Sequence, residues 1–410
     1  MSRFNANILF SFMEKGCCGQ FVAMGAAATK SCNNETSQIL RVPQKPELIW
    51  RKEISKISRS KATLKSIAAE LGITHVSVSN AYNNPAKVSA QLRQKILEHA
   101  KTVNYFGPSA AARSLRTGVC GAIGVIFNDQ LSYAFTDPHD IAFLRGVSSV
   151  CEEEGTNIVL IPLKSGGLDS FESLDAIVDG YIFNAPYKSN ATTQRAIANG
   201  LPTVAVDFDA PAYTSVLTND FDIMREITEH VLSLGHQQLA IITFPVKEGS
   251  HNLFTLDEDM DTDNYVVKQR MRGCKEAIGK TKIDLASVLV CETTNCEDGG
   301  AEATRRLLQR QPDITALVCF SDRLAYGAMK ECKRLRLDVP QQISVTGFDD
   351  IEPLSLHSTF PGLTTARQNA YEKGRKAAEA LLHGGGEQGR KIEIEATAII
   401  RDSTAKVRAA

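Results

Sequence analysis

The sequence predicts a small all-α domain of the helix-turn-helix type, followed by a large α/β core divided into two lobes. Three observations predict this fold. Between residues 63 and 106, helical apolar periodicity is interrupted by a glycine and later by a proline. After residue 118, short apolar runs alternate with amphipathic stretches, which is typical of parallel sheets covered by helices. No run of about 18 apolar residues is present, so we expect neither a transmembrane helix nor a membrane partner.

The charged residues are distributed unevenly along the chain. Between Arg51 and Arg116 there are 12 Lys or Arg and 3 Asp or Glu, whereas the net charge of all 410 residues is −1. A compact basic unit on an acidic body indicates a polyanionic partner for that unit. The alternative is an ordinary solvated surface, which does not explain why the basic residues coincide with the helical pattern.

Residues 1–60 show no steady periodicity. We interpret them as a disordered leader, or as translation from a start codon set too early, because the apolar run within 13–28 lacks the continuity and cleavage site of a signal peptide. The ten cysteines form no C-x-x-C pair, and the eight histidines form no H-x-x-x-H pair. We therefore expect no metal and no cofactor, and interpret the cysteines as buried, reduced thiols of a cytoplasmic protein.

The first predicted helix begins after Thr63, which is suited to capping a helix N-terminus, and ends at Gly72, which can adopt a left-handed conformation. Its apolar residues share one face: Leu64, Ile67, Ala68 and Leu71. Thr74 then caps a second helix that runs to Tyr82 and is broken by the Asn-Asn-Pro sequence at 83–85. A third helix follows, with four residues turned inward: Leu92, Ile96, Ala100 and Val103.

These helices meet the requirements of a helix-turn-helix. The crossing of the first two helices needs a small residue and a glycine four positions later, which are Ala68 and Gly72 here. Val78 and Ala81 have the spacing to anchor the second helix, so its outer face is left polar. The early residues of such a helix contact base edges in the major groove of DNA. We predict major-groove contacts for Thr74, His75, Val76, Ser77, Ser79 and Asn80. The alternative is a small helical bundle with a polar face.

Two residues of this face suit direct recognition of bases. Asn80 can pair bidentately with adenine, and Val76 can pack on a thymine methyl group. Short hydrogen-bond donors near helix starts suit contacts to the DNA phosphates. We predict phosphate contacts for Thr63, Asn83, Ser89 and Ser109.

The segment 107–118 predicts a short hinge helix. Pro108 suits the first turn and three alanines follow it, but so short a helix is unstable alone in water. Leu115 would be an exposed apolar residue between two arginines, a pattern suited to a wedge in the minor groove. We predict minor-groove contacts for Ala112, Arg113, Leu115 and Arg116. A plain linker helix is the alternative.

The remaining chain, 119–405, predicts the α/β core. The apolar runs predicted as strands are Ala122–Phe127, Asn157–Pro162, Gly180–Phe183, Thr203–Val206, Leu239–Thr243, Ser287–Cys291, Ala316–Phe320 and Ser344–Phe348. The helical stretches include Ile141–Glu154, Ile223–Leu234, Val266–Ile278, Ala301–Leu308 and Arg323–Leu335. So long a segment is too large for one sheet, so we expect two doubly wound lobes with a ligand cleft at the carboxyl ends of the strands. The polar segment 247–263 predicts a mobile loop.

Polar residues that follow predicted strands are candidates for binding a small polar ligand. Asp207, Asp322 and Asp349 each come directly after an apolar run, and carboxylates that accept hydrogen bonds from hydroxyl groups suit a sugar. Tyr133 and Phe135, after the first strand, can supply apolar or stacking walls. For each residue the alternative is a helix cap or a hydrogen bond between the lobes.

The chain resembles the LacI/GalR family of bacterial transcriptional regulators over nearly all of residues 62–405. The similarity lies in TLKSIAAELGITHVSVSNAYNN, KVSAQLRQKILEHAKTVNY and PSAAARSLRTG, and later in VLSLGHQQLAII, QRMRGCKEAI, SDRLAYGAM, VPQQISVTGFDD and PGLTT. The resemblance implies that Leu115 is the leucine of the hinge helix and that Arg270, in an R-x-x-G motif, faces the effector. The base-contacting positions of the family match His75, Val76 and Asn80.

The resemblance also implies a periplasmic-binding-protein-like core, a homodimer, a pseudopalindromic double-stranded DNA operator, and a sugar or related small polar effector. We therefore divide the chain into a leader (1–60), a helix-turn-helix domain (61–106), a hinge helix (107–118) and an effector-binding and dimerisation core (119–405). We expect lobe 1 at about 119–219 plus 367–388, and lobe 2 at about 220–366 plus 389–405.

The sequence thus predicts a cytoplasmic, nucleoid-associated transcriptional repressor whose affinity for its operator is controlled by a small polar effector. One alternative is a solute-binding protein without a regulatory role, which would require export of the chain. Another is an enzyme that uses the cleft, but no P-loop, dinucleotide fingerprint, nucleophile elbow or metal cluster is present. We therefore do not expect an enzyme.

Overall fold

The computed structural model describes residues 62–107, 114, 117–128, 131–161, 177–187, 195, 198, 200–247, 249–258, 261–351, 360–384 and 386–407. The predicted leader lies outside the described residues. So do five residues of the hinge segment that the sequence predicts to contact DNA: Ser109, Ala112, Arg113, Leu115 and Arg116. Of that segment, the structure describes Ser114 and Thr117 as helical.

Three helices form the first part of the described chain: α2 (Leu64–Leu71), α3 (His75–Asn83) and α4 (Ala90–Thr102), with a 3-10 helix, η1 (Pro85–Lys87), before α4. The hydroxyls of Thr63, Thr74 and Ser89 cap them, each accepting a hydrogen bond from the backbone amide three residues on. Gly72 ends α2 with a left-handed φ of +64°. The predicted caps and helix ends are confirmed, except that α3 extends one residue beyond Tyr82.

An apolar cluster holds the three helices together. Its fully buried members come in pairs from each helix: Ile67 and Ala68, Val78 and Ala81, Ile96 and Ala100. All six lie at positions that the helical periodicity predicts, because one face of each helix turns inward. The side chain of Arg93 adds a tie between α3 and α4, since its Nε donates to the carbonyl of Ala81 at 3.1 Å.

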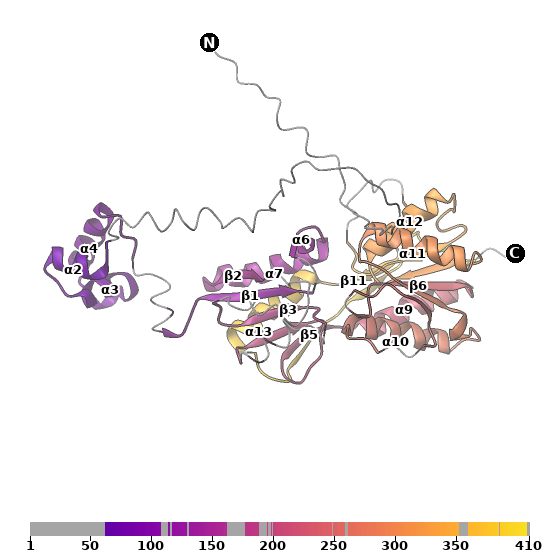
Figure 1. The fold of residues 1–410 in the computed structure, drawn as a ribbon, viewed down its shortest axis with the longest axis horizontal. Helices are drawn as coiled ribbons and strands as arrows, with labels where there is room; N and C mark the ends of the chain where they lie inside the picture. The colour runs from indigo at the N-terminus through magenta and orange to yellow at the C-terminus, as the bar shows by residue number, and fades with distance from the viewer. Residues whose placement is uncertain are drawn as a thin grey trace, which may run out of the picture.

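The first α/β lobe contains a parallel six-stranded sheet in the order β12-β5-β4-β3-β1-β2 (Figure 1). Its strands are β1 (Ala122–Phe127), β2 (Asn157–Ile161), β3 (Tyr181–Asn184), β4 (Thr203–Val206), β5 (Thr214–Thr218) and β12 (Lys391–Ile394). The short helix α6 (Leu131–Ala134) precedes α7 (Pro138–Glu154), which packs with α13 (Ala370–Gly384) over one face of the sheet. Their axes approach closely at Gly374, where a Cβ atom would lie 2.1 Å from the carbonyl oxygen of Phe143.

The second lobe contains a five-stranded sheet in the order β10-β9-β6-β8-β7. Its strands are β6 (Leu239–Thr243), β7 (Leu253–Thr255), β8 (Leu289–Glu292), β9 (Ala316–Cys319) and β10 (Ser344–Thr346), and only β7 is antiparallel to its neighbour. Helices α9 (Asp220–Ser233) and α10 (Tyr265–Gly279) cover one face. Helices α11 (Glu297–Arg310) and α12 (Asp322–Arg334) cover the other, and a 3-10 helix, η2 (Leu285–Ser287), leads into β8.

The chain crosses between the lobes three times. It leaves the first sheet after β5, returns after β11 (Thr365–Arg367), and leaves again between β12 and β13 (Thr397–Ile399), where β11 and β13 pair antiparallel. The predicted boundary at residue 389 is therefore wrong, because β12 pairs with β5 in the first sheet, with Lys391 opposite Ser215. The sequence hides this strand because Lys-Ile-Glu-Ile is a polar, half-exposed edge.

One further expectation is corrected, and one strand that the sequence does not predict is present. The segment 247–263, predicted to be a mobile loop, contains β7, which pairs with β8 through Phe254 opposite Val290. The apolar run at β5 is too short to indicate a strand in the sequence, yet all five of its residues are buried.

The cysteines that the structure describes are all free: five are buried, while Cys120 and Cys296 are half-buried. Within the described chain, no helix combines the length and hydrophobicity needed to cross a membrane.

Candidate functional site

A cavity of about 520 Å³ lies between the two lobes and takes its lining from both. Its polar residues stand at or just beyond the carboxyl ends of parallel strands in each sheet. From the first sheet come Asn128, Asn184 and Asp207, and from the second come Thr294, Ser321 and Asp349. This is where the sequence predicts a ligand cleft, since helix starts and strand ends converge at that edge of a doubly wound sheet.

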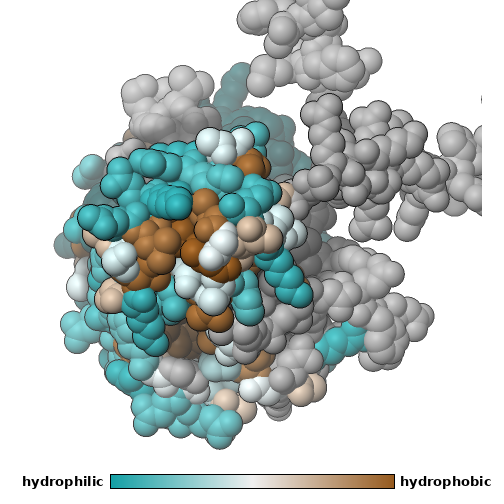
Figure 2. All heavy atoms as spheres, turned by 90° about the vertical axis from the view of Figure 1, so that its left-hand side faces the viewer, coloured by the Kyte–Doolittle hydropathy of each residue, from teal (hydrophilic) through white to brown (hydrophobic). Residues whose placement is uncertain are grey.

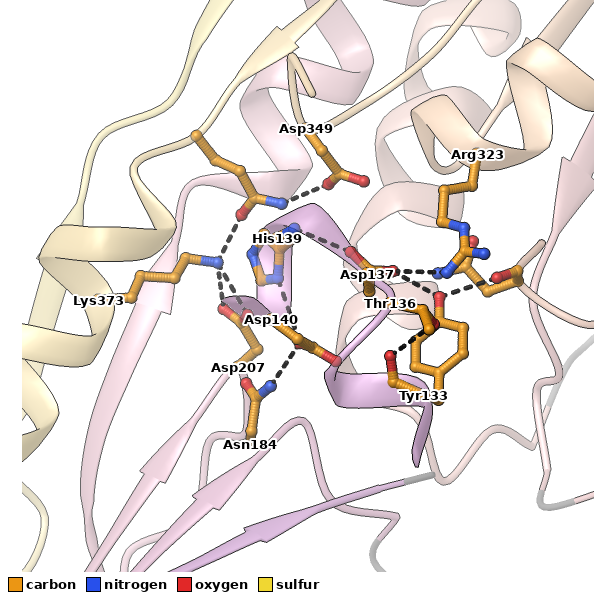
Figure 3. Close-up of polar contacts among 12 residues, drawn as sticks. Tyr133, Thr136, Asp137, His139, Asp140, Asn184, Asp207, Arg323, Asp349 and Lys373 are labelled. Atoms are coloured by element: carbon orange, nitrogen blue, oxygen red, sulfur yellow. Dashed lines mark hydrogen bonds and ion pairs between the residues drawn. The ribbon is translucent and has the colours of Figure 1, made fainter. Parts of the chain in front are cut away.

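A buried polar network on one wall joins the lobes (Figure 3). The amine of Lys373, from α13, donates to both carboxylate oxygens of Asp207, at 3.0 and 2.8 Å, and to Oε1 of Gln368 at 2.6 Å. Gln368 in turn donates from Nε2 to the carboxylate of Asp349 in the second lobe. Lys373 is fully buried. Its charge is stabilised there because all three N–H groups have acceptors and one partner is ionisable.

Arg270, from α10, reaches the cavity wall with its charge already balanced. Its Nε donates to Oδ1 of Asp220 at 2.7 Å, and NH1 donates to the carbonyl of Phe320. The guanidinium also lies over the ring of Phe348, 3.5 Å from its centroid. Burial raises the pKa of the Asp220 carboxyl, and the charge of Arg270 opposes that shift.

The first turn of α7 brings a histidine and a carboxylate to the cavity. Nδ1 of His139 lies 3.5 Å from Oδ1 of Asp140, and Nδ2 of Asn184 donates to the same oxygen at 3.0 Å. Burial lowers the pKa of His139, but the hydrogen bond to Asp140 and the charge of Asp349 outweigh it, so the net shift is upward. Among the described residues, Nε2 of His139 and Oδ1 of Asn184 are buried without a hydrogen-bond partner. Two unpaired polar atoms in a cavity wall are what a polar ligand would bind.

A second set of contacts crosses between the lobes beside the cavity (Figure 3). The hydroxyl of Tyr133 lies 2.5 Å from Oδ2 of Asp137 and 2.8 Å from the carbonyl oxygen of Asn295. From α12 of the second lobe, Arg323 donates to Oδ2 of Asp137 at 3.4 Å and lies over the Tyr133 ring, 4.8 Å from its centroid. These groups hold α6 and α7 of the first lobe against α12 of the second.

The structure places four of the six predicted effector residues in the cavity wall: Tyr133, Asp207, Arg270 and Asp349. Phe135 is not part of the described wall, and its side chain is 57% exposed. Asp322 lies beneath the wall at the start of α12, where its carboxylate accepts hydrogen bonds from Oγ1 of Thr365 at 2.5 Å and from the amide of Ile351 at 2.9 Å. Both positions argue against an effector contact, and Asp322 instead braces the end of the second sheet.

Several polar residues of this region are not among the predicted site residues, including His139, Asp140, Asn184, Gln368 and Lys373. Asn184 ends β3 and meets the same strand-end criterion that selected Asp207. No local signal distinguishes His139 and Asp140 from ordinary polar residues of a first helical turn. Lys373 was detectable only as a lysine on the buried face of an amphipathic helix.

Helix α3 presents the residues predicted to contact DNA bases. Figure 2 faces this end of the molecule and shows mainly hydrophilic side chains with an apolar area among them. His75 is exposed, and the apolar side chain of Val76 is 53% exposed. The hydroxyls of Thr74 and Ser77 lie 3.0 Å apart, and Asn83 donates to Oγ of Ser79 at 3.3 Å. The outer surface of the helix therefore carries mainly short polar side chains.

Comparisons with known proteins agree with this geometry. The model of a periplasmic binding protein-like domain matches residues 228–404. The chain is similar to the HTH-type transcriptional regulator Rv3575c of Mycobacterium tuberculosis, with 35% identity over 360 residues that cover 86% of this chain and 99% of the relative.

Two solved structures share the fold. One is a LacI-family transcriptional regulator from Corynebacterium glutamicum, with a TM-score of 0.61 and 29% identity, covering 84% of this chain and 98% of that one. The other is the lac repressor dimer bound to operator and the anti-inducer ONPF, with a TM-score of 0.69 and 23% identity, covering 84% and 99%. At that identity the second likeness shows the fold alone.

Proposed function

The chain belongs to the LacI/GalR family of bacterial transcriptional regulators, and we propose from this premise that α2 and α3 form a helix-turn-helix that inserts α3 into the major groove of an operator. The observation that supports this most directly is the outer face of α3, where an exposed valine stands among short polar side chains. Such a face suits base edges better than solvent. The phosphate contacts predicted for Thr63, Asn83 and Ser89 belong to the same proposal.

The cavity between the lobes is the proposed site of a small polar effector. Its size falls in the range of roughly 300–1,000 Å³ that is usual for small-molecule sites. Polar groups from both lobes converge on it, so a ligand that contacts both favours one arrangement of the lobes over another. A difference in affinity between two arrangements is what allows an effector to alter DNA binding.

We propose that the protein acts as a homodimeric repressor on a pseudopalindromic operator, in the cytoplasm and at the nucleoid. Two copies of α3 would then read two half-sites in successive major grooves. The hinge helix predicted over 107–118 would insert Leu115 into the minor groove. The outer surface of α3 distinguishes a DNA-binding regulator from a solute-binding protein, because a protein that binds only a solute does not need a DNA-reading helix.

The experiment that tests DNA reading starts with selection of a preferred duplex by the full-length protein from random sequences. Asn80→Ala should then weaken binding to that duplex by about 5- to 150-fold, since one bidentate base contact is worth roughly 1–3 kcal/mol. The matched control is Gln94→Ala on α4, whose side chain is exposed and, among the described residues, forms a hydrogen bond to Glu98. Equal loss of affinity in the two variants, or no preferred duplex at all, would contradict the assignment of α3.

The hinge proposal has its own test. Leu115→Ala should weaken binding to the selected duplex and leave effector affinity unchanged, because the side chain is assigned to DNA alone. Fluorescence anisotropy measures the first quantity and calorimetry the second. If the variant binds the duplex as tightly as the parent, the hinge assignment is wrong. The assignment of α3 to the major groove is not affected by that result.

A further inference from the structure

The described wall of the cavity is acidic. Four aspartates line it: Asp137, Asp140, Asp207 and Asp349. Arg323 pairs with Asp137 and Lys373 pairs with Asp207, so Asp140 and Asp349 are the two that have no lysine or arginine partner among the described residues. A ligand that enters this space leaves water for a region of lower dielectric, where a charge on the ligand interacts strongly with the charges of the wall. The sign of those charges therefore selects among ligands.

The arginine and lysine side chains described near the cavity are already committed to protein partners. Arg270 is paired with Asp220, and the three N–H groups of Lys373 all have acceptors. Arg323 is engaged by Asp137 and the ring of Tyr133. An anionic ligand would have to take one of these cations from its carboxylate and leave that carboxylate buried and unpaired, which is costly.

The helix N-termini at the cavity are already capped: Asn264 accepts a hydrogen bond from the amide of Val267 at α10, and Ser321 accepts one from the amide of Leu324 at α12. Helix N-termini bind phosphates through free backbone amides. At α7, Asp137 already occupies that position, since its Oδ1 accepts a hydrogen bond from the amide of His139 at 2.9 Å. A built-in carboxylate thus stands where a phosphate would otherwise bind.

Hydroxyl groups, by contrast, match what the wall leaves open. Oδ1 of Asn184 is a buried acceptor without a partner among the described residues, and its orientation is fixed because Nδ2 must donate to the carboxylate of Asp140. Nε2 of His139 is likewise unpartnered and can donate or accept. Tyr187, Phe244 and Val266 add apolar lining suited to the C–H faces of a ring.

We propose that the effector is an uncharged polyhydroxyl compound, a free sugar or polyol, and that this wall rejects phosphorylated and carboxylated sugars. The inference rests on the proposed function, because it names the chemical class of the effector at that site. It differs from a general preference for polar ligands in excluding anionic ones.

Matched neutral and anionic ligands test the proposal on the full-length protein. Calorimetry would compare D-glucose with glucose 6-phosphate and glucuronate, D-ribose with ribose 5-phosphate, and D-galactose with galacturonate, with sorbitol as an open-chain polyol. At least one neutral compound should bind, and its anionic counterpart should bind at least about tenfold more weakly, a difference of about 1.4 kcal/mol. An anionic member that binds more tightly than its neutral partner, or a panel without a neutral binder, overturns the proposal.

A charge variant separates electrostatic rejection from a poor steric fit. Asp349→Asn removes one wall charge with little change in shape, so the ratio of neutral to anionic affinity should fall by several-fold. The matched control, Asp261→Asn, removes an exposed charge that lies outside the cavity lining and pairs with Lys247, and should leave the ratio unchanged. An unchanged ratio in Asp349→Asn would show that shape, and not charge, excludes the anions, and would overturn the proposal.

Operator binding distinguishes failure of this inference from failure of the proposed function. If an anionic compound binds and changes affinity for the selected duplex, the regulator stands and the inference fails. If a neutral compound binds without changing that affinity, the inference stands and the regulatory role of the cavity fails.

Discussion

Asp349 combines a cavity position with a charge that its surroundings only partly stabilise. Burial raises its pKa to about 6, although the charges of His139 and Arg270 and the hydrogen bond from Gln368 lower it, and Asp137 adds a further upward contribution. An unfolded aspartate titrates near pKa ~3.9. Keeping this carboxylate ionised therefore destabilises the ligand-free fold, which is the expected cost of a group kept ready for a ligand.

The first prediction concerns Asp349 and pH. Between pH about 4 and 6 the folded protein binds more protons at this group than the unfolded chain does, so its contribution to stability falls as pH rises through that window. Asp349→Asn should therefore raise the melting temperature of the ligand-free protein above pH 6, and the gain should vanish toward pH 4. Thermal unfolding of both proteins from pH 4.5 to 8 measures the difference.

The control for this experiment is again Asp261→Asn, because its carboxylate is exposed. Its melting temperature should follow that of the parent at every pH. A gain in Asp349→Asn that is the same at pH 4.5 and 8 would contradict the raised pKa. A loss at pH 8 would show that the hydrogen bond from Gln368 outweighs the burial of the charge.

Among the elements, the turn between α2 and α3 decides how the proposed recognition helix is presented. Gly72 donates from its amide to the carbonyls of Ala68 and Ala69, and its left-handed φ sets the direction in which the chain enters α3. Nothing lies within 4 Å of the position that a Cβ atom would occupy. A side chain at position 72 is therefore disfavoured by the left-handed backbone conformation and not by steric contact with neighbouring atoms.

The second prediction is that Gly72→Ala destabilises the three-helix unit by about 1–2 kcal/mol, the cost of a left-handed conformation in an L-residue. Calorimetry of the full-length protein should show a lower transition for this unit, while effector binding to the core stays unchanged. Ala69→Ser, on the exposed surface of α2, is the matched control. If both variants unfold like the parent, the turn does not limit the stability of the unit.

At the scale of the whole molecule, two different structures join the lobes beside one cavity. One is the buried chain from Asp207 through Lys373 and Gln368 to Asp349. The other is the cluster of Tyr133, Asp137 and Arg323. The first includes Gln368, which lies in the chain crossover between β11 and α13. Because that crossover is covalent, we expect this link to remain when the lobes move. The second joins side chains of separate helices and can part when the lobes move.

The third prediction follows from that difference. Arg323→Ala removes the ion pair to Asp137 and the contact with the Tyr133 ring, so the ligand-free lobes should open more readily. Small-angle scattering should show a larger radius of gyration without effector and the parental value with saturating effector. Lys330→Ala, from the exposed side of the same helix, is the control. Equal scattering from both variants without ligand would contradict the role of this cluster.

The sequence by itself determined the local structure. Capping residues, apolar spacing and a glycine define the ends of α2 and α3, because each of these signals acts over three or four residues. It also indicated most strands of the second sheet, whose buried apolar runs are uninterrupted. The same local signal could not place β12, whose edge position leaves half of it polar.

Only the tertiary structure decided which strand-end aspartates face the cavity. Asp322 and Asp349 both follow an apolar strand, yet Thr365 and Ile351 turn the first carboxylate inward, while Gln368 meets the second at the cavity wall. These partners come from other parts of the chain and meet only after both lobes have folded. The direction of a side chain and the balance of charge around it depend on such distant neighbours, and local sequence patterns do not contain them.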